Sequence, residues 1–459
     1  MAPGPGRRAG QPPVPLTVLC GFDRHAVADT AAALLLAGSR PAAVWADPFT
    51  ADLGYVQTRV TDGDGRYADQ AFAVQERCLP STVRAATVHA VRRLHRSGRY
   101  DAMLVHLHPG IDATSAIAAL TAELAGTAAV DTVGLLLHPG WAVDLAGPAT
   151  VASKGIALAR GDDRGAAPVL AAALSAVTAI VAQGVLDQVT GPAEDALLSV
   201  LAPGAARLHP ATPFDVTPAQ LVRTGRFDPA QLDPLAARGL MDPRRTLPSC
   251  SGSLRLARWR AQRPVHPQRL RDALGHLANG FIRSTGHLRF ATRPYRLAHW
   301  DNTGDRLFIG PLGAGPPPAP ATGHPPRRPY HNDLAFLGND LDTGHIRQVL
   351  DSCLLTDREL PGGPAAWRHL ADPFPGWDDV GHGTTTSDDT APGSGRPAPG
   401  VSGARQQDGD GMKHGIQCPH REIPHRGHRP GRARRRTASA RQAASVTGRA
   451  GTAWPATPA

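Results

Sequence analysis

Short apolar runs alternate with longer amphipathic stretches over the first 200 of the 459 residues. Continuous apolar runs of about five residues predict buried strands, and apolar positions three or four residues apart predict helices. The expected strands cover residues 16–20, 42–46, 101–105, 132–137 and 177–181, and the expected helices cover residues 26–37, 82–96, 113–124 and 166–175. Strands that alternate with helices at this spacing predict an α/β fold with a parallel sheet covered on both faces.

The pattern changes after residue 250. Residues 253–259 alternate apolar and polar side chains, as a half-exposed strand does. Further short strands are expected at residues 281–284, 287–291, 297–301, 307–309 and 333–337, and helices at residues 267–278 and 343–355. We therefore predict a second unit of the α+β class, with a mostly antiparallel sheet.

These patterns divide the chain into five parts. Residues 203–248 are rich in Pro, Asp and Arg and have little periodicity, which indicates a linker with short helical turns. Residues 381–459 have almost no apolar pattern, so they cannot bury enough surface to offset the entropy cost of ordering. The expected parts are a disordered leader (1–15), an α/β domain (16–202), the linker (203–248), an α+β domain (249–380) and a disordered basic tail (381–459).

The net charge of +10 does not indicate a nucleic-acid-binding protein. The expected tail holds 12 basic and 5 acidic residues, so +7 of the charge lies there and the preceding 380 residues are nearly neutral. No apolar run approaches the roughly 18 residues that a membrane span needs, which argues against a membrane protein. The five cysteines are scattered and odd in number, which is typical of free thiols in the cytoplasm.

The first strand–turn–helix is the place for a phosphate-binding loop. Residues 21–28 have the length of the Gly-x-x-x-x-Gly-Lys-Ser/Thr motif, and Gly21 is in place. The second glycine, the phosphate-pairing lysine and the Mg²⁺-binding hydroxyl are replaced by Ala26, Val27 and Ala28. This vestigial loop argues against tight binding of GTP and Mg²⁺.

Several segments together resemble the CobW family of P-loop GTPases and metallochaperones. Residues 18–22 read Val-Leu-Cys-Gly-Phe, close to the family's Val-Leu-Ser-Gly-Phe, and residues 78–84 are similar to its Cys-x-Cys-Cys-Thr-Val-Arg metal motif. The match is strongest at residues 259–270, which read Trp-Arg-Ala-Gln-Arg-Pro-Val-His-Pro-Gln-Arg-Leu and resemble a hallmark of the CobW C-terminal domain. The resemblance spans residues 16–377. It implies a P-loop GTPase-like domain at 16–202 and a CobW C-terminal domain at 249–380.

Family members bind GTP and Mg²⁺, hold zinc or a similar ion on the cysteine motif and hand it to a client. Here the resemblance places the guanine-specificity motif on residues 182–185, Ala-Gln-Gly-Val, where every recognition residue is lost. The Walker B acidic position falls on His106, and of the three metal cysteines only Cys78 is retained. The resemblance therefore implies a degenerate member, a pseudo-GTPase.

Three histidines follow the expected strands and are candidate zinc ligands. His106 and His108 project to the same side of a strand end, and His138 ends the next strand. Parallel strands present their carboxyl ends to one crevice, so the three imidazoles are expected to converge there. The competing interpretation is that solvated histidines cap buried strands. For Cys78 the corresponding alternative is a lone loop thiol, because one thiolate cannot form a tetrahedral zinc site.

Positive charge also gathers in the second domain. Arg263, His266, Arg269, Arg283, Arg293 and His299 are candidates for a phosphate- or partner-binding face. Arginines beside prolines also often bridge loops and carbonyl groups, so a structural role stays open as the alternative.

The sequence thus predicts a cytoplasmic CobW-like protein that acts in metal homeostasis, with zinc as the expected metal. It is expected to act by binding metal or a partner, without GTP turnover. The expected partners are a client metalloprotein or a paralogous CobW protein, with no specific nucleic acid and no membrane. Two alternatives stay open: an active GTP-dependent zinc or cobalt chaperone, and a non-catalytic interaction scaffold.

Overall fold

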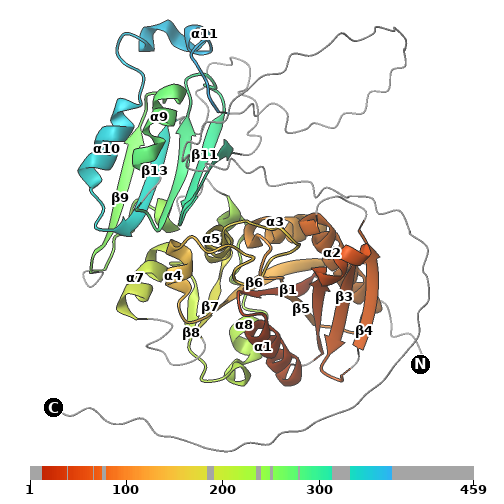
Figure 1. The fold of residues 1–459 in the computed structure, drawn as a ribbon. Helices are drawn as coiled ribbons and strands as arrows, with labels where there is room; N and C mark the ends of the chain where they lie inside the picture. The colour runs from red at the N-terminus through yellow and green to blue at the C-terminus, as the bar shows by residue number, and fades with distance from the viewer. Residues whose placement is uncertain are drawn as a thin grey trace, which may run out of the picture. The chain divides into compact units, whose positions relative to one another are not determined.

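The computed structural model describes residues 13–38, 40–65, 67–74, 79–182, 191–233, 239–248, 252–277, 280–312 and 331–374. The expected basic tail and residues 1–12 of the expected leader lie outside this part of the chain. The described residues form an eight-stranded and a five-stranded sheet with helices packed on them (Figure 1).

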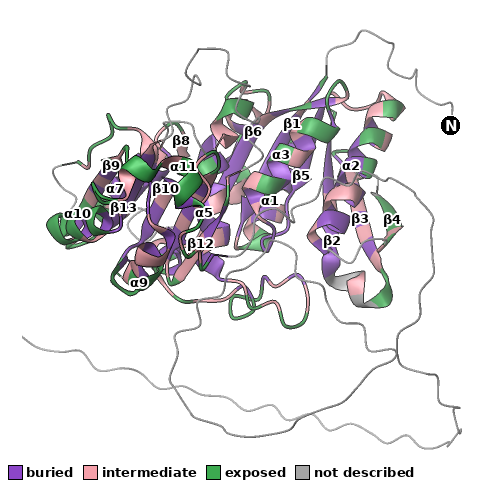
Figure 2. Ribbon diagram, turned by 90° about the horizontal axis from the view of Figure 1, so that it is seen from above, coloured by how far each residue is buried: buried purple, intermediate pink, exposed green. Residues whose placement is uncertain are grey.

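The first sheet has the strand order β4-β3-β2-β5-β1-β6-β7-β8. Its strands are β1 (Val14–Gly21), β2 (Pro41–Asp47), β3 (Tyr55–Asp62), β4 (Tyr67–Ala73), β5 (Ala102–His106), β6 (Ala128–Leu137), β7 (Ala179–Ala182) and β8 (Ala206–Leu208). The pairs from β2 across to β8 are all parallel, which confirms the predicted parallel sheet. Buried residues are concentrated on its central strands (Figure 2).

Helices cover both faces of this sheet (Figure 1). The helices are α1 (Arg24–Ala37), α2 (Leu79–Ser97), α3 (Ala113–Glu123), α4 (Trp141–Ala146), α5 (Ala166–Ala176), α7 (Pro192–Leu201) and α8 (Pro218–Leu221). On one face Val27 and Leu34 of α1 pack in a cluster with Leu19 of β1. On the other face α2, α3 and α5 pack against the alternate residues of the same strands, such as Val18. No helix in the described ranges is long and apolar enough to cross a membrane.

Two parts of this region depart from the expected pattern. An antiparallel hairpin, β3–β4, extends the edge of the sheet beyond β2. The segment expected to be a linker does contain short helical turns, namely η2 (Pro213–Asp215), α8, η3 (Pro229–Leu232) and η4 (Gly239–Met241). It also supplies β8, which pairs with β7, and Leu221, whose carbonyl accepts a hydrogen bond from the buried Thr17 hydroxyl.

The second sheet is antiparallel, in the order β12-β11-β10-β13-β9, which confirms the predicted α+β unit. Its strands are β9 (Leu254–Ala261), β10 (Arg283–Arg289), β11 (Leu297–Thr303), β12 (Arg306–Pro311) and β13 (Asn332–Asn339), and its helices are α9 (Pro267–Leu277), α10 (Thr343–Ser352) and the short α11 (Gly363–Trp367). Trp259, Trp300 and Phe336 are buried together with Leu270 of α9 and Leu350 of α10. The two short strands expected around residues 281–291 are one strand, β10, so that expectation was wrong.

An acid-sensitive contact ties the end of this unit to α9. Both carboxylate oxygens of Glu359 accept hydrogen bonds from Arg269, at 2.5 and 3.1 Å. The hydrogen bonds from Arg269 lower the pKa of Glu359 from 4.5 to about 2, with smaller contributions from the Thr356 amide and hydroxyl.

Glu359→Gln is therefore expected to lower the free energy of unfolding by about 1–2 kcal/mol at pH 7. Because the folded-state pKa is depressed, Glu359 stabilises the fold above pH 4.5 and loses this effect as pH falls towards 2. The difference between wild type and variant should shrink over that interval, as measured by urea unfolding at several pH values. A difference that stays constant down to pH 2 would contradict this assignment.

Candidate functional site

The loop between β1 and α1 is closed by a side chain of the protein itself. Asp23 is the N-cap of α1, and its Oδ1 atom accepts hydrogen bonds from the amides of His25 (2.9 Å) and Ala26 (3.1 Å). In a phosphate-binding loop, amides at this helix N-terminus point at the anion. Here a carboxylate takes two of them, so the loop satisfies its helix terminus without a ligand.

The side chains at the altered positions of the vestigial loop point into the core or lack a hydrogen-bond donor. Val27, at the lysine position, is a fully buried residue of α1, and Ala26 and Ala28 are half-buried. Gly21 is required by packing, because a Cβ atom there would lie 2.7 Å from the carbonyl oxygen of Leu136. This glycine is therefore explained by the close approach of β1 and β6.

A narrow cavity lies beside the loop, lined by Cys20, Gly21, Phe22, His108 and Ile111 among others. Its volume is about 10 Å³, which is room for about one water molecule. Drug-sized ligands occupy roughly 300 Å³ or more. In this conformation the cavity cannot hold a nucleotide.

Removal of the cap should destabilise α1 measurably. We expect Asp23→Ala to lower the free energy of unfolding by about 1 kcal/mol, because two amides lose their acceptor. Asp23→Ser keeps a capping oxygen and is the matched control, with little expected change. Urea denaturation of both variants checks this, and equal stability of the alanine and serine variants would contradict the capping role.

His106 ends β5 and is 5% exposed. Its ring stacks on Trp45 of β2, with centroids 4.9 Å apart and planes 22° apart. Burial, helped by the nearby His108, lowers the pKa of His106 to about 4, so the imidazole is neutral at pH 7. Its Nε2 atom is buried and has no hydrogen-bond partner among the described residues.

His108 lies in the turn that follows β5 and is 3% exposed. Its Nδ1 atom accepts a hydrogen bond from the Gly110 amide at 3.1 Å, which shapes the turn. Burial first, and then the charges of Arg24 and Arg164, lower the pKa of His108 to about 4. This histidine is thus neutral too, and one of its ring nitrogens is engaged with the backbone.

His138 follows β6 and forms a different contact. Its Nε2 atom lies 2.8 Å from Oδ2 of Asp144, whose Oδ1 atom lies 2.5 Å from Nζ of Lys154. The ring also stacks on Phe22, with centroids 5.5 Å apart. A carboxylate held between an imidazole and an ammonium group is a structural clamp on the α4 region.

His106 ends β5, His108 lies in the turn after it, and His138 follows β6, which is separated from β5 by β1. The three histidines make different contacts. Among the residues that the structure describes, no three His, Cys, Asp or Glu side chains are grouped so as to hold a metal ion. The expected convergence of His106, His108 and His138 on one ion is therefore absent in this conformation. Cys78 and residues 183–185 of the expected guanine-specificity motif lie outside the described residues, and Ala182 is the last residue of β7.

The expected basic face of the second domain is made of paired arginines. The pairs are Arg263–Asp357 (2.6 Å), Arg269–Glu359 (2.5 Å), Arg283–Asp301 (2.5 Å) and Arg293–Asp372 (3.0 Å). The pKa of both His266 and His299 is lowered, chiefly by burial. These contacts favour the structural interpretation of this set over a phosphate-binding face.

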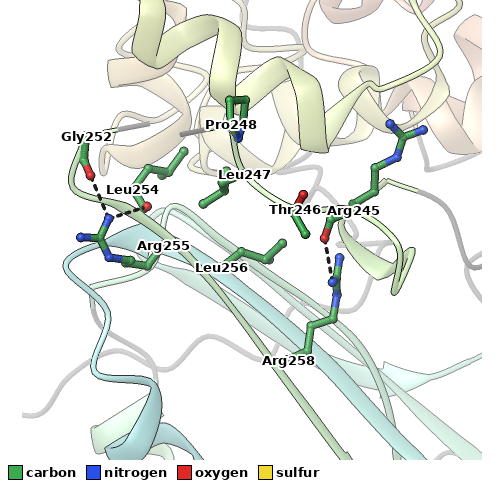
Figure 3. Close-up of a pocket in the computed structure, with 9 residues that line it drawn as sticks. All are labelled: Arg245, Thr246, Leu247, Pro248, Gly252, Leu254, Arg255, Leu256 and Arg258. Carbon is green, nitrogen blue, oxygen red and sulfur yellow. Dashed lines mark hydrogen bonds between the residues drawn. The ribbon is translucent and has the colours of Figure 1, made fainter. Parts of the chain in front are cut away.

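Sequence reasoning missed an arginine clamp at the start of the second sheet. Arg258 of β9 donates hydrogen bonds to the carbonyl groups of Leu240, Asp242, Pro243 and Arg245. Beside it lies a cavity of about 350 Å³, whose lining includes Leu247, Leu254 and Leu256 (Figure 3). The acceptors are backbone carbonyls, which carry no residue-specific signal in a sequence.

Comparison with known proteins gives matches of partial length. Residues 255–354 match the model of the cobalamin synthesis protein cobW C-terminal domain. The zinc chaperone Rv0106 of Mycobacterium tuberculosis H37Rv is 29% identical over 173 residues, which cover 33% of this chain and 43% of that protein. The uncharacterized protein Mb0109 of Mycobacterium bovis matches to the same extent. The match thus spans less than half the length of these relatives.

A Zn(II)-bound YjiA GTPase from E. coli covers 75% of this chain and 100% of its own, at 13% identity and a TM-score of 0.34. A Zn(II)-bound triple mutant of YjiA GTPase gives 15% identity and a TM-score of 0.35, with the same coverage. The family-model match runs from β9 to α10, and residues 259–270 lie on β9, the turn after it and α9. Residues 255–354 of this chain are thus similar to the cobW C-terminal domain.

Proposed function

We propose that this chain is a cytoplasmic CobW-like protein of zinc homeostasis that acts by binding metal or a partner, with GTP turnover lost. The observation that carries the proposal is that a match to the cobW C-terminal domain model follows a parallel sheet whose β1–α1 loop is capped by Asp23. The similarity to a zinc chaperone supports zinc as the cargo. The expected partner is a client metalloprotein or a paralogous CobW protein that supplies the nucleotide chemistry.

The proposed metal-binding residues of the first domain are His106, His108, His138 and Cys78. Support comes from two buried ring nitrogens, Nε2 of His106 and Nδ1 of His138, which have no hydrogen-bond partner within the described part of the chain. Neutral imidazoles are the form that binds zinc, and burial keeps His106 and His108 neutral. Zinc binding would require the side chains to move from their present contacts.

Zinc titration of the metal-depleted full chain tests the proposal. We expect the wild-type protein to bind zinc without nucleotide, and His106→Gln/His108→Gln/His138→Gln to bind it at least tenfold more weakly. His276→Gln/His345→Gln alters two histidines of α9 and α10 and is the matched control. Binding of zinc only in the presence of GTP would favour the active chaperone, and the absence of zinc binding would favour the scaffold.

A further inference from the structure

A row of polar side chains crosses one face of the second sheet. Strand register places Arg260 of β9 opposite Asp333 of β13, Asp333 opposite His287 of β10, and His287 opposite His299 of β11. Residues opposite one another in a sheet project from the same face. This face is the reverse of the one that packs Trp259 and its neighbours against α9 and α10.

His331, which directly precedes β13, joins this row and presents a lone pair. An NH2 group of Arg260 lies 2.6 Å from Nε2 of His331. Because a guanidinium group only donates hydrogen bonds, Nε2 of His331 must be the unprotonated acceptor. The same Nε2 atom lies 3.6 Å from Oδ2 of Asp333, and Nε of Arg260 lies 3.6 Å from that oxygen.

Nε2 of His331 and Oδ2 of Asp333 are thus about as far apart as two ligands of one metal ion. Two zinc ligands at about 2.05 Å from a tetrahedral ion lie about 3.3 Å apart. Arg260 now supplies the positive charge between them, and its side chain is 66% exposed, so it can leave to solvent. The side chains of His331 and Asp333 are 13% and 24% exposed, which leaves a path for an ion.

His287 is the third donor within reach. It is 8% exposed, its ring centroid lies 5.3 Å from that of His331, and its Nδ1 atom is buried without a hydrogen-bond partner among the described residues. In the conformation described, these three side chains are not grouped so as to hold a metal ion. A metal site on them would require the guanidinium to leave and the His287 ring to rotate.

We propose that His331, Asp333 and His287 form an exchangeable zinc site in the CobW C-terminal domain, with Arg260 as the cation that zinc displaces. This inference rests on the proposed function, because it gives the zinc cargo a second position. A site with three protein ligands keeps one tetrahedral position open, which a client's ligand can occupy during transfer. The competing arginine weakens the site and so favours release.

Because zinc is proposed to displace a cation, one variant is expected to gain zinc affinity and another to lose it. Zinc affinity is measured by chelator competition on the metal-depleted full chain. Arg260→Ala is expected to bind zinc at least fivefold more tightly than wild type, since no guanidinium has to leave. His331→Gln/Asp333→Asn should bind at least tenfold more weakly. Arg255→Ala removes the same charge from an exposed position of β9 and should leave the affinity unchanged.

Cobalt absorption and unfolding measurements separate this site from the proposed site of the first domain. Bound Co²⁺ should lose part of its visible absorption in His331→Gln/Asp333→Asn while the variant remains folded by circular dichroism. Zinc binding that persists in this variant but is lost in the His106, His108 and His138 triple variant would overturn the inference and leave the proposed function standing. An unchanged affinity in Arg260→Ala would also overturn it.

Discussion

Gly286→Ala is expected to unfold the antiparallel-sheet domain or to lower its free energy of unfolding by about 3–5 kcal/mol. Gly286 has a φ of +146°, and a Cβ atom there would lie 2.0 Å from the carbonyl oxygen of Asp333. Overpacking of a tight site costs about 1–3 kcal/mol, and a disfavoured backbone conformation costs about 1–3 kcal/mol more. The obstructing atom belongs to the backbone of β13, so it cannot yield without breaking the β10–β13 pairing.

Urea unfolding followed by tryptophan fluorescence measures this effect, because Trp259 and Trp300 are buried in the same domain. The matched control is Gly275→Ala in α9, where a Cβ atom would meet nothing within 4 Å. A helical glycine replaced by alanine should stabilise by about 0.5–1 kcal/mol. If Gly286→Ala unfolds at the same urea concentration as wild type, the close approach of β10 and β13 is wrong.

Arg283→Ala is expected to cost about 3 kcal/mol of unfolding free energy. Both amino groups of Arg283 donate to the Asp301 carboxylate, at 2.5 and 3.2 Å, and one also donates to the Thr303 hydroxyl. The Arg283 side chain is 9% exposed and that of Asp301 is 29% exposed. Removal of one partner leaves a largely buried charge unpaired, which costs about 3–5 kcal/mol in fully buried pairs.

A double-mutant cycle separates the ion pair from lost packing. Asp301→Asn removes the carboxylate charge, so Arg283→Ala/Asp301→Asn should recover part of the loss of Arg283→Ala. The coupling energy from urea denaturation is expected to be about 1–3 kcal/mol. Strictly additive single-variant effects would show that the two side chains do not interact in solution.

Periodicity predicted most strands and helices correctly, and the exceptions have physical causes. The β3–β4 hairpin was missed because its strands lie at a sheet edge and mix polar with apolar residues. In the sequence, Val56 and Val60 alternate with polar residues at 57, 59 and 61, a pattern that indicates a half-buried strand. Gly286 made β10, which reads Arg-Ser-Thr-Gly-His-Leu-Arg, look like two strands, because a glycine inside a strand pattern suggests an irregularity.

The candidate site could be predicted only in part. The lost lysine and hydroxyl positions, Val27 and Ala28, are readable directly, and an aspartate before a helix is a recognisable cap signal. The side chains that contact the histidines could not be read from the sequence, because the fold brings Trp45 to His106 and Asp144 to His138. The contacts of His331 with Arg260 and Asp333 depend on strand register across β9 and β13, which a single sequence does not specify.

The most direct test of the central claim measures zinc binding and GTP hydrolysis on one sample of the metal-depleted full chain. We expect that the protein binds zinc without nucleotide, and that GTP with Mg²⁺ is hydrolysed no faster than in buffer, with or without zinc. Tight binding of GTP together with zinc-stimulated hydrolysis would contradict it, because the loop capped by Asp23 would then have to open and hold phosphate.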